Sequence, residues 1–590
     1  MDQIALHAHW PAVNRKMVAK LISELAYEQA FKIEENDNEF SFILSQSVGY
    51  HFSGKLNIWG QIVIDPTSLE RKANGKRSDI TATQFMRDIQ CLIGIDDDVL
   101  AEHFEDLNAT LLGDCKLALR KVNMSAKELA FLSCEQQQLL FDGHPKFAFN
   151  KGRRGWGSDD LALYAPESER AFQLSWVAVH HSILQKATNH KVEWEELIES
   201  AVNETELYEM DALLSSFNVD ISDYIYVPVH PWQWRQKLSI LFAREMAEKT
   251  LIYLGEFGDE FLPQLSIRTL SNTTRPDSYD IKLPLTIMNT SCYRGIPGRY
   301  ILAGPMASDW LDSIFKSDEL FIDKQAEILQ EPAAGFVAQS DYKLLVDAPY
   351  RYHELLGVIW RESAQSKLSN NETAILMAAL MESDEEGTPL ISEYISASRL
   401  SIEEWLTKLF DAVVIPYYHL LCKYGVSLIA HGQNVTLVME DAQPKRILLK
   451  DFQGDMRFIA RDIPEQEGLA PLIKEVTVSL PEELIIHDLQ TGHFVTVLRF
   501  ISPLVETLGL PETKFYQLLG LRIKAYVEAY PDYQDRFERL DLFKPKILRI
   551  GLNLAKFRHS TDSSASRMLP DMDDQLDNPL FKASNNNNIK

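Results

Sequence analysis

The 590-residue chain carries 59 basic and 85 acidic side chains, a formal net charge of -26, and 45% of its residues are hydrophobic. This is the composition of an ordinary globular protein, and the negative charge disfavours nucleic acid and anionic lipid membranes as partners. Without a C-x-x-C pair, a signal peptide or a run near 18 apolar residues, we expect a cytoplasmic protein with no disulfide framework, structural zinc site or membrane span.

The first predicted elements are a helix and a small antiparallel sheet. Apolar residues recur at helical spacing from about residue 14 to residue 31, and residues 40–64 are rich in Phe, Ile, Val, Tyr and Trp with glycines as turns. Helical periodicity returns from about residue 82 to residue 140. We therefore expect residues 1–140 to form an N-terminal lobe of helices plus a small sheet.

Two further regions follow. Residues 141–380 are rich in polar motifs, with predicted helices around 172–187 and 238–249. Residues 381–590 are predicted to be mainly helical, with long amphipathic helices at 402–421 and 512–530 and a hairpin between residues 434 and 456. The fold class that we expect is α+β.

A basic segment opens the second region. Between Gly143 and Gly155 the sequence carries five basic or imidazole side chains and no acid: His144, Lys146, Lys151, Arg153 and Arg154. Guanidinium groups bind carboxylates and phosphates through paired hydrogen bonds, so the segment is typical of a site for a polycarboxylate or a nucleotide. The alternative is a solvated basic loop.

A second candidate anion site extends from Ser266 to Arg294. Hydroxyl and cationic side chains alternate here across what reads as two strands and a turn, namely Ser266, Arg268, Thr269, Lys282, Thr290, Ser291 and Arg294. Positive charge together with hydrogen-bond donors suits a triphosphate. The alternative is that a cation such as Lys282 is paired with an acid for structural reasons.

The hairpin gives the strongest indication of chemistry. His431-Gly-Gln-Asn434 enters one strand, and the returning strand ends at Lys450-Asp451. Such a hairpin would bring Asn434 and Asp451 together, and these oxygen ligands suit Mg²⁺ beside nucleotide phosphates. His431 would lie beside the metal and bind an anion. The alternative is that His431 and Asp451 only cap and pair.

The same layout is typical of kinase-like phosphotransferases. In those enzymes an Asp follows two residues after the His and serves the acceptor hydroxyl. Gln433 occupies that position here and cannot act as a base. A kinase-like enzyme therefore remains an alternative, as does a non-catalytic citrate or nucleotide sensor.

Five strings together resemble the NRPS-independent siderophore (NIS) synthetases, the IucA/IucC family. They are residues 143–153, His230-Pro-Trp-Gln233, Ser266-Ile-Arg-Thr269, His431-Gly-Gln-Asn434 and Lys450-Asp-Phe-Gln-Gly454, and their order along the chain matches. The resemblance implies a cupped-hand fold with a thumb at residues 1–140, antiparallel-sheet fingers at 141–380 and a mainly helical palm at 381–590. The nucleotide would lie between fingers and palm.

The resemblance also implies the reaction. A citryl carboxylate attacks the α-phosphate of ATP, pyrophosphate leaves, and an amine then displaces AMP to form an amide. The strings at 282–300, 348–362 and 487–496 are most similar to the family branch that joins N2-citryl-N6-acetyl-N6-hydroxylysine to N6-acetyl-N6-hydroxylysine. A related synthetase acting on another citrate or succinyl hydroxamate is the alternative. A homo-oligomer is compatible with either.

The resemblance assigns roles to individual residues. The ATP-binding set would be Ser266, Arg268, Thr269, Lys282, Arg294, Gln433, Asn434 and Asp451, with Asn434 and Asp451 on Mg²⁺. The set for the substrate carboxylates would be His144, Lys151, Arg153, Thr290, Ser291, Arg294 and His431, and the catalytic set His431, Arg294 and Lys282. One departure is Ile429, where some relatives carry an acid, and this weakens the case for a third protein ligand on the metal.

Overall fold

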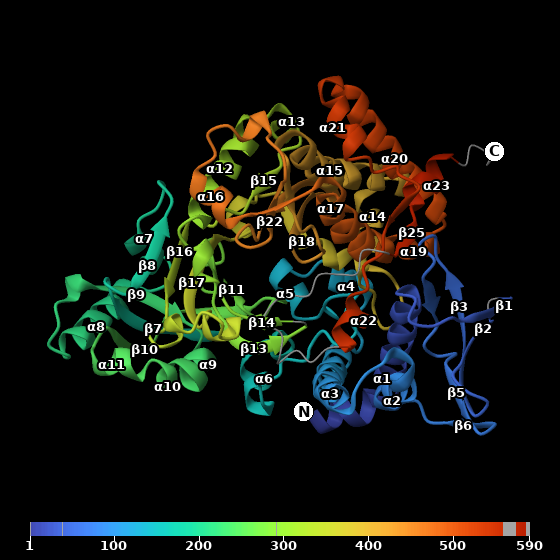
Figure 1. The fold of residues 1–590 in the computed structure, drawn as a ribbon, viewed down its shortest axis with the longest axis horizontal. Helices are drawn as coiled ribbons and strands as arrows, with labels where there is room; N and C mark the ends of the chain where they lie inside the picture. The colour runs from blue at the N-terminus through green and yellow to red at the C-terminus, as the bar shows by residue number, and fades with distance from the viewer. Residues whose placement is uncertain (1, 38, 291, 559–573, 586–590) are drawn as a thin grey trace.

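The computed structural model describes residues 2–37, 39–290, 292–558 and 574–585, and it divides visibly into three regions (Figure 1). The N-terminal residues, in blue, lie on one side of the molecule. A large sheet with its covering helices, in green and yellow, lies on the other, and the C-terminal helices lie above them. The fold is α+β, as the sequence predicts. The boundaries at residues 140 and 380 stay a prediction.

The N-terminal lobe packs three helices against small antiparallel strands. Its helix α1 begins well before the predicted residue 14, and Thr81 and Gly94 bound α2, with the Thr81 hydroxyl accepting from the Gln84 amide and Gly94 at φ 70°. The elements are α1 (Asp2–Tyr27), β1 (Glu34–Asn36), β2 (Glu39–Ile43), β3 (Val48–Leu56), β4 (Ile62–Ile64), β5 (Glu70–Ala73), β6 (Lys76–Ser78), α2 (Ala82–Ile93) and α3 (Asp97–Lys121).

An eight-stranded antiparallel sheet dominates the middle of the chain. Its order is β8-β16-β17-β12-β11-β10-β7-β9. The strands are β7 (Phe172–His180), β8 (Leu184–Thr188), β9 (Tyr224–Val229), β10 (Leu251–Pro263), β11 (Thr269–Asn272), β12 (Tyr279–Lys282), β16 (Ala333–Val337) and β17 (Leu356–Glu362).

The predicted helix at 172–187 is wrong, because this segment forms β7 and β8. Residues 174–179 are buried on both faces of the sheet, and Ser175 is the one polar residue among them. Such a run has no alternation, so periodicity alone does not separate it from a buried helix. The predicted helix at 238–249 corresponds to a π-helical segment (Trp234–Leu238), α10 (Ser239–Leu241) and α11 (Ala243–Ala247).

The two faces of this sheet have different neighbours. Trp194 of α7 (Trp194–Glu199) and Leu214 of α8 (Glu204–Ser215) pack with Val358 and Trp360 on one face. Residues alternate along a strand, so Ile359 and Arg361 point to the other face. Lys282 lies opposite Ile359 in the register and joins them there. This second face carries the polar chemistry.

The C-terminal region combines long helices with two small sheets. Its main helix, α15, is bounded by a capping box at Ser401 and Glu404 and by Gly425 at φ 60°. The elements are α14 (Leu390–Ser398), α15 (Ile402–Tyr424), α19 (Arg499–Thr507), α20 (Glu512–Ala529), a sheet of β15 (Glu327–Ile328), β21 (Gln443–Leu449), β20 (Val435–Glu440) and β18 (Glu372–Leu376), and a sheet of β19 (Val426–Leu428), β22 (Met456–Ile459) and β23 (Val478–Leu480). The predicted hairpin and both long helices are confirmed.

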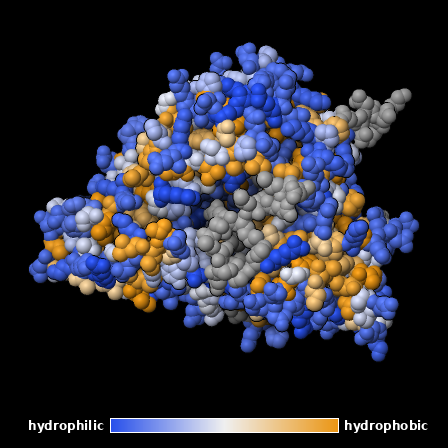
Figure 2. Space-filling view, in the orientation of Figure 1, coloured by the Kyte–Doolittle hydropathy of each residue, from blue (hydrophilic) through white to orange (hydrophobic). Residues whose placement is uncertain are grey.

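The chain returns to its first lobe near residue 555. Helix α22 (Leu552–Phe557) places Phe557 in the apolar core of the N-terminal lobe, beside His103 and Phe149. Figure 2 shows mainly hydrophilic residues over the C-terminal region on this face of the molecule. In the part of the chain that the structure describes, every helix is too short or too polar to cross a membrane.

Candidate functional site

The hairpin of β20 and β21 brings the two strings of the sequence analysis to one end. Its register pairs Val435 with Leu449, so Asn434 and Lys450 are the next residues along each strand. Asp451 follows with a left-handed backbone at φ 67°. Its carboxylate accepts a hydrogen bond from Lys282 Nζ at 2.6 Å and another from the Arg361 guanidinium. The hairpin thus meets the polar face of the eight-stranded sheet at Asp451.

Arg361 and Glu331 extend this contact and were missed from the sequence. The Arg361 guanidinium bonds to Glu331 Oε1 at 2.7 Å, and the two side chains are 1% and 0% exposed. The free oxygen of Glu331 accepts from the Gln453 backbone amide at 3.4 Å. Arg361 lies inside the string at 348–362 that carried the resemblance, and that is the one signal that pointed to it.

The charges around Asp451 shift its pKa and those of its neighbours. Burial raises the pKa of the Asp451 carboxyl, but the charges of Arg361 and Lys282 outweigh burial and hold it well below the ordinary range. Burial lowers the pKa of Lys282, and the charge of Arg268 adds to that effect. Burial also raises the pKa of Asp280 to about 6. The site therefore concentrates cations around one ionised acid.

The predicted triphosphate segment converges on the same place. Thr269 lies directly opposite Lys282 in the β11–β12 register, and Ser266 Oγ accepts from the Thr269 amide at 3.3 Å. The Arg268 guanidinium donates to the Gly295 carbonyl, which follows Arg294 in the chain. The β11 and β12 strands and the adjoining turns thus bring Ser266, Arg268, Thr269 and Lys282 close together, although Lys282 lies 13 or more positions from the others in the sequence.

Asn434 makes a different carboxylate contact from the one predicted. Its side-chain amide donates to the Ile429 carbonyl at 3.3 Å and lies 3.5 Å from Asp455 Oδ2. Asp455 belongs to the same string as Asp451 but was not selected from the sequence. Asn434, Asp451 and Asp455 bring side-chain oxygens to this end of the hairpin, and oxygen atoms of this kind suit Mg²⁺.

His431 and His144 face each other across two lobes. Their ring centroids are 5.9 Å apart, and His431 Nδ1 accepts from the Gln433 amide at 3.2 Å. Burial lowers the pKa of both imidazoles, and the charge of Arg294 contributes to each shift. Both rings are therefore neutral at pH 7, and either can donate or accept a single hydrogen bond.

Arg294 lies in β14 (Cys292–Arg294), the second strand of a hairpin with β13 (Leu285–Asn289). Its Nη2 donates to the Asn289 carbonyl at 2.8 Å. Arg294 Nε, Asn289 Oδ1 and the amide of Gln453 are buried without hydrogen-bond partners among the described residues. Orphaned polar atoms of this kind fit a polar ligand. Thr290 has φ 63°, and Ser291 lies outside the described residues.

The basic segment at 143–155 is neither solvated nor free of acids. Acidic residues from other segments pair with its cations, namely Glu28 with Lys146 at 3.1 Å, Asp114 with Lys151 at 2.7 Å, Glu167 with Arg153 at 2.5 Å, and Glu102 and Asp106 with Arg154 at 3.2 and 3.1 Å. Lys151 and Arg153 are each only 4% exposed. The alternative of a solvated loop is wrong, and a role in carboxylate binding for these two residues stays a prediction.

Two further motifs support the site rather than join it. His230 follows the last residue of β9 and caps α9 (Pro231–Gln233), with Nδ1 accepting from the Trp232 amide at 3.1 Å. His493, in the π-helical segment Gln490–Leu498, bonds through Nδ1 to the Ala430 carbonyl at 2.9 Å. His493 thereby fixes the loop that leads into His431.

Lys556 of α22 is a fourth residue that sequence reasoning missed. Its Nζ lies 3.2 Å from Asp106 Oδ2, and Arg294 is among the charges that lower its pKa, after burial. The N-terminal lobe, the sheet and the C-terminal residues all contribute to the surroundings of Arg294. The arrangement can hold a polyanion, a hard cation and a carboxylate side by side.

The chain is similar to known proteins over nearly its whole length. The IucA / IucC family model matches residues 130–382, and a model described as a ferric iron reductase FhuF-like transporter matches residues 403–566. The chain is 63% identical to the aerobactin synthase of Vibrio mimicus and 46% identical to that of Escherichia coli, over 99% and 98% of each chain. The solved aerobactin synthetase IucC of Klebsiella pneumoniae superposes with a TM-score of 0.88 at 43% identity, covering 98% of this chain and 99% of that one.

Proposed function

The chain belongs to the IucA/IucC family of NRPS-independent siderophore synthetases, and from this premise we propose that it is an ATP-dependent ligase that forms an amide in siderophore biosynthesis. The observation that carries the proposal is the contact of Asp451 with Lys282 and Arg361. It joins the two strings that would handle ATP.

The proposed reaction has two steps. A carboxylate oxygen of the acid attacks the α-phosphorus of ATP, the bond to the β-phosphate breaks, and pyrophosphate leaves. An amine nitrogen then attacks the acyl carbon, the bond to AMP breaks, and the nitrogen releases a proton to solvent. The products are an amide, AMP and pyrophosphate.

The cations of the site would offset the repulsion between a polyanionic acid and a triphosphate. Lys282, Arg268 and Arg294 supply positive charge where the pentavalent phosphorus gains negative charge, and a buried site strengthens such interactions. Because the His431 ring is neutral, it can donate a hydrogen bond to a substrate carboxylate while that carboxylate stays ionised. Asn434, Asp451 and Asp455 would hold Mg²⁺, which would draw charge from the phosphates.

The proposed acid is N2-citryl-N6-acetyl-N6-hydroxylysine and the proposed amine is N6-acetyl-N6-hydroxylysine, which together give aerobactin. The support is the 63% identity to the Vibrio mimicus aerobactin synthase over nearly the whole chain. Comparing kcat/KM for this acid, for citrate and for a succinyl hydroxamate tests the assignment. A preference for either of the latter two moves the enzyme to another branch of the family.

Product analysis tests the reaction class. Enzyme, ATP, Mg²⁺ and acid with hydroxylamine as acceptor are expected to release AMP and pyrophosphate and to form a hydroxamate of the acid. ADP and phosphate as products would favour the kinase-like alternative. Chelation of Mg²⁺ by EDTA is expected to stop AMP release, and added Mg²⁺ to restore it.

A further inference from the structure

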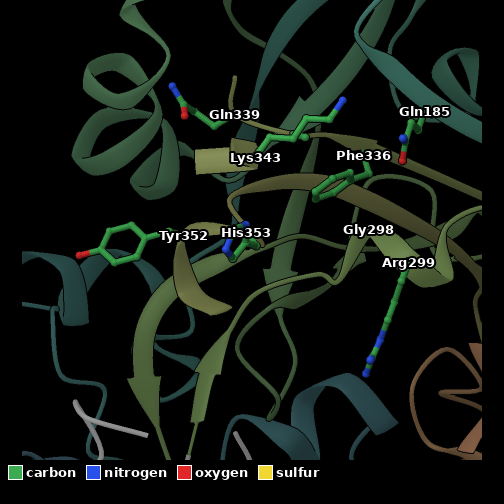
Figure 3. Close-up of a pocket in the computed structure, with 9 residues that line it drawn as sticks. Gln185, Gly298, Arg299, Phe336, Gln339, Lys343, Tyr352 and His353 are labelled. Carbon is green, nitrogen blue, oxygen red and sulfur yellow. The ribbon is translucent and has the colours of Figure 1, made fainter. Parts of the chain in front are cut away.

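A cavity of about 300 Å³ lies on the eight-stranded sheet, at its β8–β16 edge (Figure 3). Phe336 of β16 and Gln185 of β8 line it from the sheet. Gly298 lines it from the loop after β14, and Lys343 and His353 from the segment between β16 and β17. None of these residues belongs to the site around Asp451.

The lining of this cavity is cationic. Arg299 and Lys343 are among its residues, and no carboxylate is, in a chain of net charge -26. Within the described part of the chain, Lys343 forms no ion pair. The Nε2 atom of His353 is buried there without a hydrogen-bond partner. The cavity therefore offers hydrogen-bond donors to the oxygen atoms of a ligand. It has no carboxylate that could pair with an ammonium group of the ligand beside that of Lys343.

The side chains also divide into a polar and an apolar part. Figure 3 shows Lys343 extending above the Phe336 ring towards the side where Gln185 lies, with His353 near the centre and Arg299 directed away. An aromatic surface with a few convergent polar groups is typical of sites for small amphipathic molecules. The complementary ligand carries paired oxygens, as in a carboxylate or a hydroxamate, on an apolar stem.

The cavity opens on the face of the sheet that carries the hairpin site. Ala334 lies opposite Ile359, and Ile359 lies opposite Lys282 in the next pair of strands. Phe336 and Ala334 alternate with the residues of the covered face and pack with Ile296 and Ile301. The cavity and Lys282 thus share one face of the sheet.

One loop, residues 295–300, separates the cavity from the string 450–455. Gly298 contacts the Phe336 ring so closely that an added Cβ would lie 2.5 Å from it. On the other side of the loop, the Tyr300 ring lies over Gly454, 3.5 Å from the position a Cβ would take there. The cavity and the hairpin site therefore lie on the two sides of this one loop.

We propose that this cavity binds the end of the amine substrate that is remote from its nucleophilic nitrogen. Lys343, His353 and Gln185 donate to the two oxygens of the hydroxamate at that end, and Phe336 contacts the apolar stem. The inference rests on the proposed function, since it assumes an amine acceptor. It assigns to the cavity the selection of the acceptor and no part in adenylation.

The test separates the two half-reactions in full-length variants. Lys343→Glu and Gln185→Ala change exposed side chains, so both variants are expected to fold. Lys408→Glu makes the same charge change at an exposed position on α15 and serves as the control. Hydroxylamine-trapped AMP release measures adenylation, and amide formation with N6-acetyl-N6-hydroxylysine measures acceptor use.

Lys343→Glu is expected to raise the KM for the amine by about 10-fold or more, the range of a lost charge-assisted hydrogen bond, with a smaller rise for Gln185→Ala. Hydroxylamine-trapped turnover and the Lys408→Glu control are expected to remain within about twofold of wild type. An unchanged KM for the amine, or an equal loss of hydroxylamine-trapped turnover, overturns the proposal.

Lysine, which lacks the hydroxamate, tests this assignment further. Lys343→Glu is expected to leave the KM for lysine within about twofold of wild type. An equal rise of the KM for lysine and for the hydroxamate amine would contradict binding of the hydroxamate in the cavity.

Failure of the proposed function is a separate result. If the wild-type enzyme releases no AMP with any acid, the ligase assignment fails, and titration calorimetry with N6-acetyl-N6-hydroxylysine still decides the cavity. Binding that is lost in Lys343→Glu and kept in Lys408→Glu supports the assignment. Absence of binding to the wild-type protein overturns it.

Discussion

At the scale of single residues, the carboxylate of Asp451 holds its own segment, β12 and β17 together through ion pairs. Its carboxylate lies between Lys282 at 2.6 Å and Arg361, and Arg361 in turn bonds to Glu331. Removing one partner of a buried ion pair leaves the other charge uncompensated, which costs more than the pair contributes. A neutral residue at 451 therefore leaves two buried cations facing each other.

Asp451→Asn is expected to lower adenylation by about 100-fold or more, since the substitution removes a proposed metal ligand and disturbs Lys282, which is proposed to bind the phosphates. Hydroxylamine-trapped AMP release measures the effect, and circular dichroism checks the fold. Turnover within a few-fold of wild type would remove Asp451 from the site.

Asp411→Asn is a matched control for this substitution. Asp411 accepts from Arg522 at 2.6 Å in a partly exposed ion pair on α15 and α20, away from the hairpin. Its loss is expected to cost at most about 1 kcal/mol of stability. Adenylation is expected to stay near the wild-type rate, and a fall comparable to that of Asp451→Asn would indicate a general effect of acid removal.

The sequence predicts individual residues of this site better than their contacts. Lys282 and Asp451 were both selected from their strings, but 169 positions separate them, and no local pattern pairs residues so far apart. The segment at 143–155 shows the reverse error. It contains no acid, yet Glu28, Asp114 and Glu167 reach its cations from elsewhere in the chain. The charges within a short stretch of sequence therefore do not predict which charges surround that stretch in the folded protein.

At the scale of elements, the turn of the β20–β21 hairpin is a weak point. The register pairs Glu440 with Gln443, which leaves a two-residue loop, Asp441-Ala442, with φ values of 50° and 61°. Both positive angles are what a type I′ turn requires, and glycine is favoured at its second position. Alanine in this conformation stores strain at the end of the hairpin that lies away from the site.

Ala442→Gly is expected to stabilise the protein by about 0.5–1 kcal/mol, because it relieves a left-handed alanine. Urea unfolding measures the change. The Ala442 carbonyl, which accepts from Trp405 Nε1 at 3.0 Å, is unaffected by the substitution. Ala412→Gly inside α15 serves as the opposite control, with a loss of about 1 kcal/mol expected. A destabilised Ala442→Gly would contradict the turn assignment.

The π-helical segment that contains His493 is expected to control the loop before His431. His493→Leu removes the bond to the Ala430 carbonyl, at a cost of about 1 kcal/mol, and is expected to raise the KM for ATP several-fold. His493→Gln can still donate and is expected to recover part of the loss. Equal KM values in wild type and His493→Leu would show that the loop holds its position without this bond.

Helices were predicted well and the large sheet was not. The helix predicted at 402–421 is α15, which ends at Tyr424, and the one predicted at 512–530 is α20, which ends at Ala529. Amphipathic helices display their period in the sequence. Strand β7 is covered on both sides, with Trp176 and Val177 both buried, so it displays none. Its pairing with β10 and β9 is a long-range property.

At the scale of the whole molecule, buried histidines link stability to pH. Burial lowers the pKa of His103, His487 and His493 to about 4 and that of His230 to about 3. An imidazole in the unfolded chain has a pKa of about 6.5, so below that pH the unfolded state binds more protons than the folded state. The free energy of unfolding is therefore expected to fall as the pH drops from about 6.5 towards 4.

Urea unfolding between pH 7.5 and 5 measures this dependence. Each buried histidine that stays neutral is expected to contribute a slope of up to about 1.4 kcal/mol per pH unit, and His493→Leu is expected to lose one such contribution. Raised carboxyl pKa values, as at Asp280 and Asp488, both about 6, act in the opposite direction. A stability that is flat or rising on acidification would contradict the expected sign.

Helix α22 has a consequence for how the protein is made. Asn553 donates to the Lys146 carbonyl and accepts from the Ala148 amide, 405 positions earlier, and Lys556 pairs with Asp106. The first lobe therefore leaves the ribosome long before its last helix exists, with buried polar groups still unsatisfied. Until residue 557 emerges, that lobe is an incomplete folding unit for chaperones to shield. A nonsense codon shortly before residue 552 would damage the beginning of the protein as much as its end.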